Sequence, residues 1–155
     1  MARAYRFRPM DDTDAREISG WRYEPPYDFY DADADPADLE ELLDPERRRD
    51  AYFSVLDEDD RIAGLFQFER EGKTVNLGLK LRPDLTGRGL GLEFLLCGLR
   101  FARERFGPER FTLSVATFNQ RAISVYERAG FRRGENFMHE TNGSEHEFLR
   151  MERER

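Results

Sequence analysis

Hydrophobic and polar positions alternate in some segments of the chain and recur every three to four residues in others. Alternation predicts a half-buried strand, and the longer period predicts an amphipathic helix. Strands are expected within residues 4–10, 51–56, 61–69, 74–82, 110–118, 131–140 and 145–154. Helices are expected within residues 11–21, 35–43, 89–106 and 119–130.

Residues that favour helix ends and turns lie at the borders of these segments. Asp35 is a helix cap followed by Pro36, a residue suited to the first helical position. Asn119 is a second N-cap, and Gly130 lies just beyond the end of its helix. The pair Asn142–Gly143 predicts a tight hairpin between the last two strands.

Short polar turns separate the strands at 51–56, 61–69 and 74–82, which predicts an antiparallel meander. The complete order is β-α-α-β-β-β-α-β-α-β-β, so we expect an α+β fold with a mixed sheet in one domain over residues 1–155. The helix at 89–106 is apolar around much of its circumference and is expected to be central and buried. The only cysteine, Cys97, falls in that helix and is interpreted as a core residue; with one cysteine there is no intramolecular disulfide.

The composition narrows the class of protein. Hydrophobic residues make up 39% of the 155 residues, which is sufficient for a packed core. The net charge of −7 argues against general nucleic-acid binding. The N-terminal segment has no signal-like apolar run, and no stretch approaches 18 consecutive apolar residues. We therefore expect a soluble, cytoplasmic protein that does not bind membranes or nucleic acid.

Acidic residues are concentrated in residues 24–50, which hold eleven of them against three arginines, a net charge of −8. One interpretation is a solvated acidic helix and loop. The other is a surface that attracts a cationic substrate. The sequence leaves both open.

The segment GRGLG places Gly87, Gly89 and Gly91 at the start of the helix expected at 89–106. A nucleoside triphosphate site would need a lysine and a hydroxyl residue after the last glycine, where the chain has Leu92 and Glu93. A dinucleotide site would need the spacing Gly-x-Gly-x-x-Gly. A pyrophosphate at a helix N-terminus, as in coenzyme A, needs only exposed N–H groups and the helix dipole. A tight structural turn is the remaining interpretation.

A second motif lies about 30 residues downstream, where Asn119, Ala122, Tyr126, Gly130 and Phe131 form Asn-x-x-Ala-x-x-x-Tyr-x-x-x-Gly-Phe. With it, the chain resembles the GNAT acetyltransferase superfamily. The signature of that superfamily is a strand ending in apolar-x-Pro, a glycine-rich turn into a helix, a further strand and then this motif. The first part corresponds to Leu81-Arg82-Pro83 and the three glycines, and the two motifs together cover residues 75–131.

The resemblance implies a splayed, mostly antiparallel sheet and an N-acetyltransferase that uses acetyl-CoA. The acetyl group would move to a primary amine by direct attack on the thioester. This chain departs from the family pattern in one respect, because Thr86 stands where an arginine or glutamine usually begins the turn. Arg88 is expected to supply the local positive charge instead. The cofactor-binding residues implied by the resemblance are Leu79, Leu81, Thr86, Gly87, Arg88, Gly89, Leu90, Gly91, Leu92 and Asn119.

For the chemistry, the resemblance places a general acid at Tyr126, which would give its proton to the departing thiolate. The alternative is a helix tyrosine with its ring in the core. The base is open: Glu69 is the nearest acidic candidate by sequence, and a solvated strand end or deprotonation through water are the alternatives. A non-catalytic sensor or interaction module that binds coenzyme A is the rival to an enzyme.

The family resemblance places the acceptor against residues 21–31, where aromatic and acidic side chains could surround a cationic amine. Packing of this loop on the core is the alternative. The acceptor is expected to be a small-molecule amine or a peptide N-terminus, the protein a monomer or homodimer, and no metal ligands are expected. The candidate substrate-binding residues are Trp21, Tyr23, Glu24, Tyr27, Asp28 and Tyr30.

Overall fold

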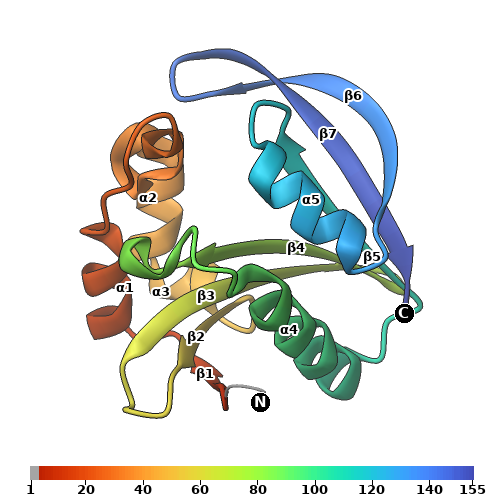
Figure 1. Ribbon diagram of the computed structural model, residues 1–155. Helices are drawn as coiled ribbons and strands as arrows, with labels where there is room; N and C mark the ends of the chain where they lie inside the picture. The colour runs from red at the N-terminus through yellow and green to blue at the C-terminus, as the bar shows by residue number, and fades with distance from the viewer. Residues whose placement is uncertain (1–3) are drawn as a thin grey trace.

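The computed structural model describes residues 4–155, which form a seven-stranded sheet in the order β1-β2-β3-β4-β5-β7-β6 (Figure 1). Every neighbouring pair is antiparallel except β4 and β5, which are parallel. The α+β class and the mixed sheet predicted from the sequence are therefore confirmed. The strands are β1 (Arg6–Pro9), β2 (Tyr52–Leu56), β3 (Ile62–Glu71), β4 (Thr74–Leu81), β5 (Arg110–Ala116), β6 (Arg132–Thr141) and β7 (Ser144–Glu154).

The α-helices occur in the predicted order, with one short helix, α3, in addition. The segment between α1 and α2, expected to be a loop, contains two turns of 3-10 helix, and a third 3-10 turn follows β4. The helices are α1 (Asp12–Ser19), η1 (Tyr27–Tyr30), η2 (Ala32–Ala34), α2 (Pro36–Leu43), α3 (Pro45–Arg48), η3 (Pro83–Leu85), α4 (Gly91–Phe106) and α5 (Gln120–Arg128).

The two faces of the sheet carry separate hydrophobic cores. Alternating residues of β2 point to opposite faces, so that Tyr52 joins one core and Phe53 the other. In β3, Leu65 and Phe66 divide in the same way. One core is covered by α4 and α5, and the other by α1 and α2, as the arrangement in Figure 1 shows. Strands β2 and β3 are consequently buried on both faces.

A buried carboxylate ties α1 to the sheet. Asp14 accepts hydrogen bonds from the Arg8 guanidinium at 2.7 and 3.2 Å and from the Ser54 hydroxyl at 2.8 Å. Burial alone would raise the pKa of Asp14, but these hydrogen bonds outweigh it, so the pKa lies below its ordinary value. This contact is structural and lies away from the site described below.

The long helix α4 is buried along one side only, which corrects the expectation of a helix buried all round. It begins at Gly91 rather than residue 89. The sheet-facing side packs so closely that a Cβ on Gly98 would lie 2.1 Å from the Phe66 ring. On the other side Leu96 is 39% exposed, and Cys97 is half-buried rather than enclosed in the core. A helix lying on a sheet has only one face to bury, whatever its sequence offers.

The predicted helix caps and hairpin are confirmed. Asp35 and Asn119 each accept a hydrogen bond from the first turn of α2 and α5, respectively. The β6–β7 turn has Asn142 and Gly143 at positive φ. Its tip returns to the segment before α2, because Thr141 donates a hydrogen bond to Asp35 at 2.9 Å. Among the helices of residues 4–155, none is long and apolar enough to cross a membrane.

The parallel pair β4–β5 is the feature that positions the site. These strands pair only from Thr74 to Leu77 on β4 and from Arg110 to Leu113 on β5. Beyond that point both strands continue, β4 to Leu81 and β5 to Ala116, without facing one another in the register. The sheet therefore opens into a wedge between the C-terminal halves of β4 and β5.

Candidate active site

A cavity of about 690 Å³ occupies this wedge. Its walls come from the C-terminal halves of β4 and β5, the turn before α4, the first turns of α5, the 3-10 turn η1 and one side of α2. Most of the residues predicted to form the site line it, although they come from distant parts of the sequence. These are Tyr23, Tyr27, Tyr30, Leu79, Leu81, Thr86, Gly87, Gly89, Leu90, Gly91, Leu92, Asn119 and Tyr126.

The glycine turn opens directly into the cavity. Gly87 and Gly89 have φ values of +71° and +76°, which residues with a side chain rarely adopt. The hydroxyl of Thr86 donates to the Pro83 carbonyl at 2.7 Å, so it fixes the preceding 3-10 turn instead of reaching into the cavity. Helix α4 then begins at Gly91 with unpaired N–H groups in its first turn. The turn therefore presents backbone donors and the positive end of a helix dipole to the cavity.

The free edge of β4 forms a second wall. The N–H of Arg82 donates to Ala63 of β3 at 2.8 Å, which sets the direction of the alternating backbone groups. By that alternation the N–H groups of Leu79 and Leu81 point away from β3, toward the open side of the wedge. The Leu81 carbonyl on that side accepts a hydrogen bond from the Tyr23 hydroxyl at 2.7 Å. Strand β4 thus offers unpaired donors where β5 has separated from it.

Positive charge near the turn comes from α5 rather than from the turn itself. Arg88 is exposed, donates to the Asp84 carbonyl at 3.3 Å and does not line the cavity. Arg121 does line it, and one of its terminal nitrogens lies 3.2 Å from the position of a Cβ on Gly87. Its guanidinium carbon lies 4.1 Å from the centre of the Tyr27 ring, a cation–π contact. No carboxylate of residues 4–155 pairs with Arg121, so its donors remain available to a ligand.

Tyr126 is half-buried on α5 and lines the cavity. Burial raises its pKa, and the nearby Tyr30 hydroxyl raises it further, so the phenol stays protonated at neutral pH. Within residues 4–155 its hydroxyl has no hydrogen-bond partner. Asn119 caps α5 through its Oδ1 and donates from Nδ2 to the Tyr30 hydroxyl at 3.1 Å. Asn119 therefore fixes both the start of α5 and the position of Tyr30 in the 3-10 turn η1.

The loop at residues 21–31 contributes only part of what the sequence predicted. In a 3-10 turn, residues three apart share a side, which turns Tyr27 and Tyr30 together toward the cavity. Asp28 lies between them in sequence, is exposed and does not line the cavity, and the same is true of Glu24. Trp21 is buried in the core under α1 and α2, where the need to bury its ring outweighs any role in the site.

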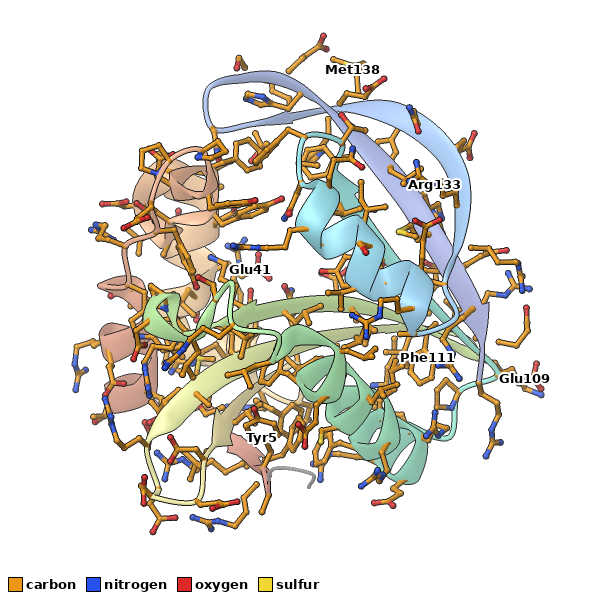
Figure 2. All side chains as sticks on the ribbon, viewed as in Figure 1. Tyr5, Glu41, Glu109, Phe111, Arg133 and Met138 are labelled. Carbon is orange, nitrogen blue, oxygen red and sulfur yellow. The ribbon has the colours of Figure 1, made fainter. Side chains whose placement is uncertain are left out.

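Two acidic residues that sequence reasoning did not single out line the cavity from α2. Asp38 and Glu41 are three positions apart, so they share one side of this helix. Glu41 is half-buried and is labelled in Figure 2 on the side of α2 that faces α5. The three-residue spacing of Asp38 and Glu41 could have predicted that they share one side of a helix. Only the packing of α2 against the sheet shows that this side faces the cavity.

Beneath Glu41, the floor of the cavity is polar. The Gln67 amide donates to Glu41 at 3.2 Å and also to Glu69 at 3.1 Å. Glu69, the base candidate from the sequence, is exposed and does not line the cavity. Burial raises the pKa of Tyr52, and the negative charge of the nearby Glu41 carboxylate raises it further.

Lys80 adds a cation to the same end of the cavity. Its Nζ donates to the Tyr30 carbonyl at 2.5 Å. Burial lowers the pKa of Lys80, while the carboxylates of Asp38 and Asp31 counteract that effect. The α2 end of the cavity therefore carries two carboxylates and one lysine.

Comparison with known proteins agrees with this geometry. The model of an acetyltransferase (GNAT) domain matches residues 5–132, which is most of the chain. The chain belongs to the GNAT acetyltransferase family. The match includes the glycine turn and the Asn119–Phe131 motif, and the resemblance suggested by the sequence is confirmed.

Individual relatives share only parts of their length with this GNAT protein. A mycothiol acetyltransferase from Salinispora arenicola is 39% identical over 64 residues, 41% of this chain and 20% of the relative. One from Rhodococcus jostii is 31% identical over 103 residues, 57% of this chain and 33% of the relative. The chain therefore spans between a fifth and a third of the length of these two relatives.

Solved structures show the same fold over nearly the whole chain. A spermidine N-acetyltransferase from Vibrio cholerae, solved with CoA and spermine, superposes with a TM-score of 0.74 at 20% identity, covering 97% of this chain and 95% of that one. A structure described as a putative phosphinothricin N-acetyltransferase gives a TM-score of 0.71 at 19% identity, covering 97% and 98%. At these identities the likeness establishes the fold.

Proposed function

We propose that this protein transfers the acetyl group of acetyl-CoA to the nitrogen of a primary amine, by direct attack on the thioester. The observation that carries the proposal is the wedge in which the free edge of β4 leads to the glycine turn at the start of α4. This arrangement suits an elongated molecule with a pantetheine arm at one end and phosphates at the other. The match to the GNAT domain supports the same conclusion.

The residues of the wedge fit the parts of the cofactor. The backbone donors of residues 86–92 would hold the pyrophosphate, because N–H groups at a helix start bind phosphate without a lysine. Arg121 would add positive charge there, in the role that the sequence suggested for Arg88. The pantetheine arm would lie beside Leu79 and Leu81 as an extra strand, and Asn119 would lie next to it.

Bound acetyl-CoA would supply an activated acyl group, and the protein would supply the donors. The N–H of Leu79 or Leu81 would hydrogen-bond the carbonyl oxygen as negative charge develops on it. Tyr126 would give its proton to the sulfur when the C–S bond breaks. The raised pKa of Tyr126 supports this role, since the group must be protonated at neutral pH.

The acceptor would enter from the α2 side, where Asp38 and Glu41 face the cavity and the tyrosines of η1 border it. Carboxylates and aromatic rings attract an ammonium group, so a cationic amine is favoured. Within the acidic segment, Asp38 and Glu41 are the residues that support attraction of a cationic substrate, whereas Glu24 and Asp28 are exposed and do not line the cavity. Spermidine is one cation worth testing, because a similar fold acts on it in the Vibrio cholerae protein.

The experiment is to measure thiol release from acetyl-CoA with a panel of amines: spermidine, kanamycin, L-lysine and the tripeptide Ala-Ala-Ala. We expect at least one amine to accelerate thiol release and to gain one acetyl group in mass. Binding of acetyl-CoA without acceleration by any amine would instead support the sensor or interaction module, and absence of binding would refute both functions.

A further inference from the structure

The proposed transfer requires a group that removes a proton from the acceptor, since an alkyl amine is an ammonium ion at neutral pH. Of the carboxylates in residues 4–155, Asp38 and Glu41 are those that line the cavity. Glu41 is the one whose position is fixed by a hydrogen bond, from the Gln67 amide at 3.2 Å. A fixed carboxylate is what a proton acceptor needs, because its catalytic value depends on its position.

The strand register places Glu41 close to the reacting end of the wedge. Tyr52, Gln67 and Gly78 are direct neighbours across β2, β3 and β4. The Oε1 of the Gln67 amide lies 3.5 Å from the position of a Cβ on Gly78, and the Nε2 of the same amide donates to Glu41, so Gly78 and the Glu41 carboxylate flank one amide group. Gly78 has no side chain to cover the sheet at that point, and it immediately precedes Leu79. The Glu41 carboxylate thus faces the stretch of β4 that would bind the thioester.

We propose that Glu41 is the residue that takes the proton from the acceptor ammonium. The inference rests on the proposed acetyl transfer and adds the base that the sequence did not identify. Glu69 accepts from the same Gln67 amide at 3.1 Å, but it is exposed and does not line the cavity. Asp38 is more exposed than Glu41, and no hydrogen bond from residues 4–155 holds its carboxylate in place, although burial and the nearby Asp35 raise its pKa.

The protons balance as follows. The ammonium gives one proton to Glu41, which passes it to solvent. The neutral nitrogen then forms the N–C bond while the C–S bond breaks, and Tyr126 gives its proton to the sulfur. The nitrogen loses a second proton as the amide forms, and that proton restores Tyr126. One proton is released overall, and no oxidant, reductant or metal is needed.

Several charged groups surround Glu41 and enter any pH profile. Asp38 lies on the same helix side, Tyr52 on β2 and Glu69 on β3, while Lys80 faces Asp38 from β4. His139 of β6 also acts on Asp38. Removing the Glu41 carboxylate leaves all of these in place, so a matched pair of variants can isolate its contribution.

The test compares Glu41→Gln with Glu40→Gln, using the panel amine with the highest kcat/KM in the unmodified protein. Residue 40 is the exposed neighbour on α2 and lies outside the cavity. We expect Glu41→Gln to lower kcat/KM about 100-fold at pH 7, within the range of general base catalysis, and the deficit to shrink below about 10-fold near pH 9.5. At that pH more of the amine is already neutral. Glu40→Gln is expected to match the unmodified protein.

Acetyl-CoA affinity and melting temperature are measured for each variant, and both should stay unchanged. A deficit of the same size at every pH, or none at all, would overturn the role of Glu41. If Glu41→Gln does not fold, Gln67→Leu replaces it: loss of the amide should lower kcat/KM with the same pH dependence but a smaller deficit. If the unmodified protein releases no thiol with any amine, the proposed function itself fails; turnover that is insensitive to both variants refutes only the base.

Discussion

Replacing Tyr126 by phenylalanine tests the chemistry with the smallest structural change. The substitution removes one hydroxyl and keeps the ring, which packs against the core under α5 with its centre 6.2 Å from that of Phe131. The hydroxyl has no hydrogen-bond partner within residues 4–155, so no buried donor or acceptor is left unpaired. The melting temperature should therefore change little. Acetyl-CoA affinity should also change little, because the hydroxyl acts only when the thiolate develops.

The expected loss lies in kcat. General acid catalysis contributes roughly 10²–10⁴-fold, which corresponds to about 3–5 kcal/mol in the activation free energy. An interaction made only in the transition state lowers kcat and kcat/KM equally. Because burial raises the pKa of Tyr126 above its ordinary value near 10, the unmodified protein should show no loss of this acid below about pH 10.

The assay is thiol release at saturating acetyl-CoA, with pre-steady-state mixing to show that chemistry limits the rate. Tyr5→Phe is the matched control, since Tyr5 packs edge-on against Phe94 at 5.6 Å and lies outside the cavity. An unchanged kcat in Tyr126→Phe, with chemistry rate-limiting, would refute the acid role and return Tyr126 to a packing residue.

Three further predictions concern the cofactor site and the fold. Gly89→Val should abolish acetyl-CoA binding, because a branched side chain would block the approach of the pyrophosphate to the turn. Gly72→Val, with a φ of +60° in the β3–β4 hairpin outside the cavity, should bear similar backbone strain, about 1–2 kcal/mol, and should bind normally; calorimetry distinguishes the two variants. Arg121→Gln should weaken acetyl-CoA binding about 10- to 100-fold, because a hydrogen bond to a charged group contributes about 1.5–3 kcal/mol. Arg88→Gln should have little effect on binding, and equal losses in the two variants would argue against α5 as the source of positive charge. Asp14→Asn should lower the free energy of unfolding at pH 7 by about 1–3 kcal/mol. Because the folded pKa of Asp14 is lowered, its contribution is present above about pH 4 and disappears as the pH falls through the folded value, so urea titrations of the two proteins should converge in acid.

Local signals in the sequence were sufficient for most of the fold and for the residues that line the glycine-turn end of the cavity. The caps at Asp35 and Asn119, the Asn142–Gly143 turn and the glycines before α4 each act within a few residues, so their effect can be predicted without knowing the tertiary structure. The Asn119–Phe131 motif then linked two such segments to one family.

The α2 end of the cavity depends on how distant segments meet, and that information is not local. Acidic residues occur throughout 24–50, but only docking of α2 against the sheet selects Asp38 and Glu41 for the cavity. Arg121 was missed for the same reason, because its proximity to Gly87 joins α5 to a turn more than thirty residues earlier. The helical period of α4 predicted its apolar positions but not that a single face of the helix would be covered. Because only one face is covered, Cys97 is half-buried.

The most direct test is the change in melting temperature on adding acetyl-CoA, because every role assigned above depends on its binding in the wedge between β4 and β5. A ligand at about 100 times its dissociation constant stabilises the folded state by about 2.7 kcal/mol. For a domain of this size, that corresponds to a rise of about 5–10 °C. We predict such a rise for the unmodified protein, saturating at one acetyl-CoA per chain, and its loss in Gly89→Val. A folded protein whose melting temperature does not move at saturating acetyl-CoA would contradict the assignment of the wedge.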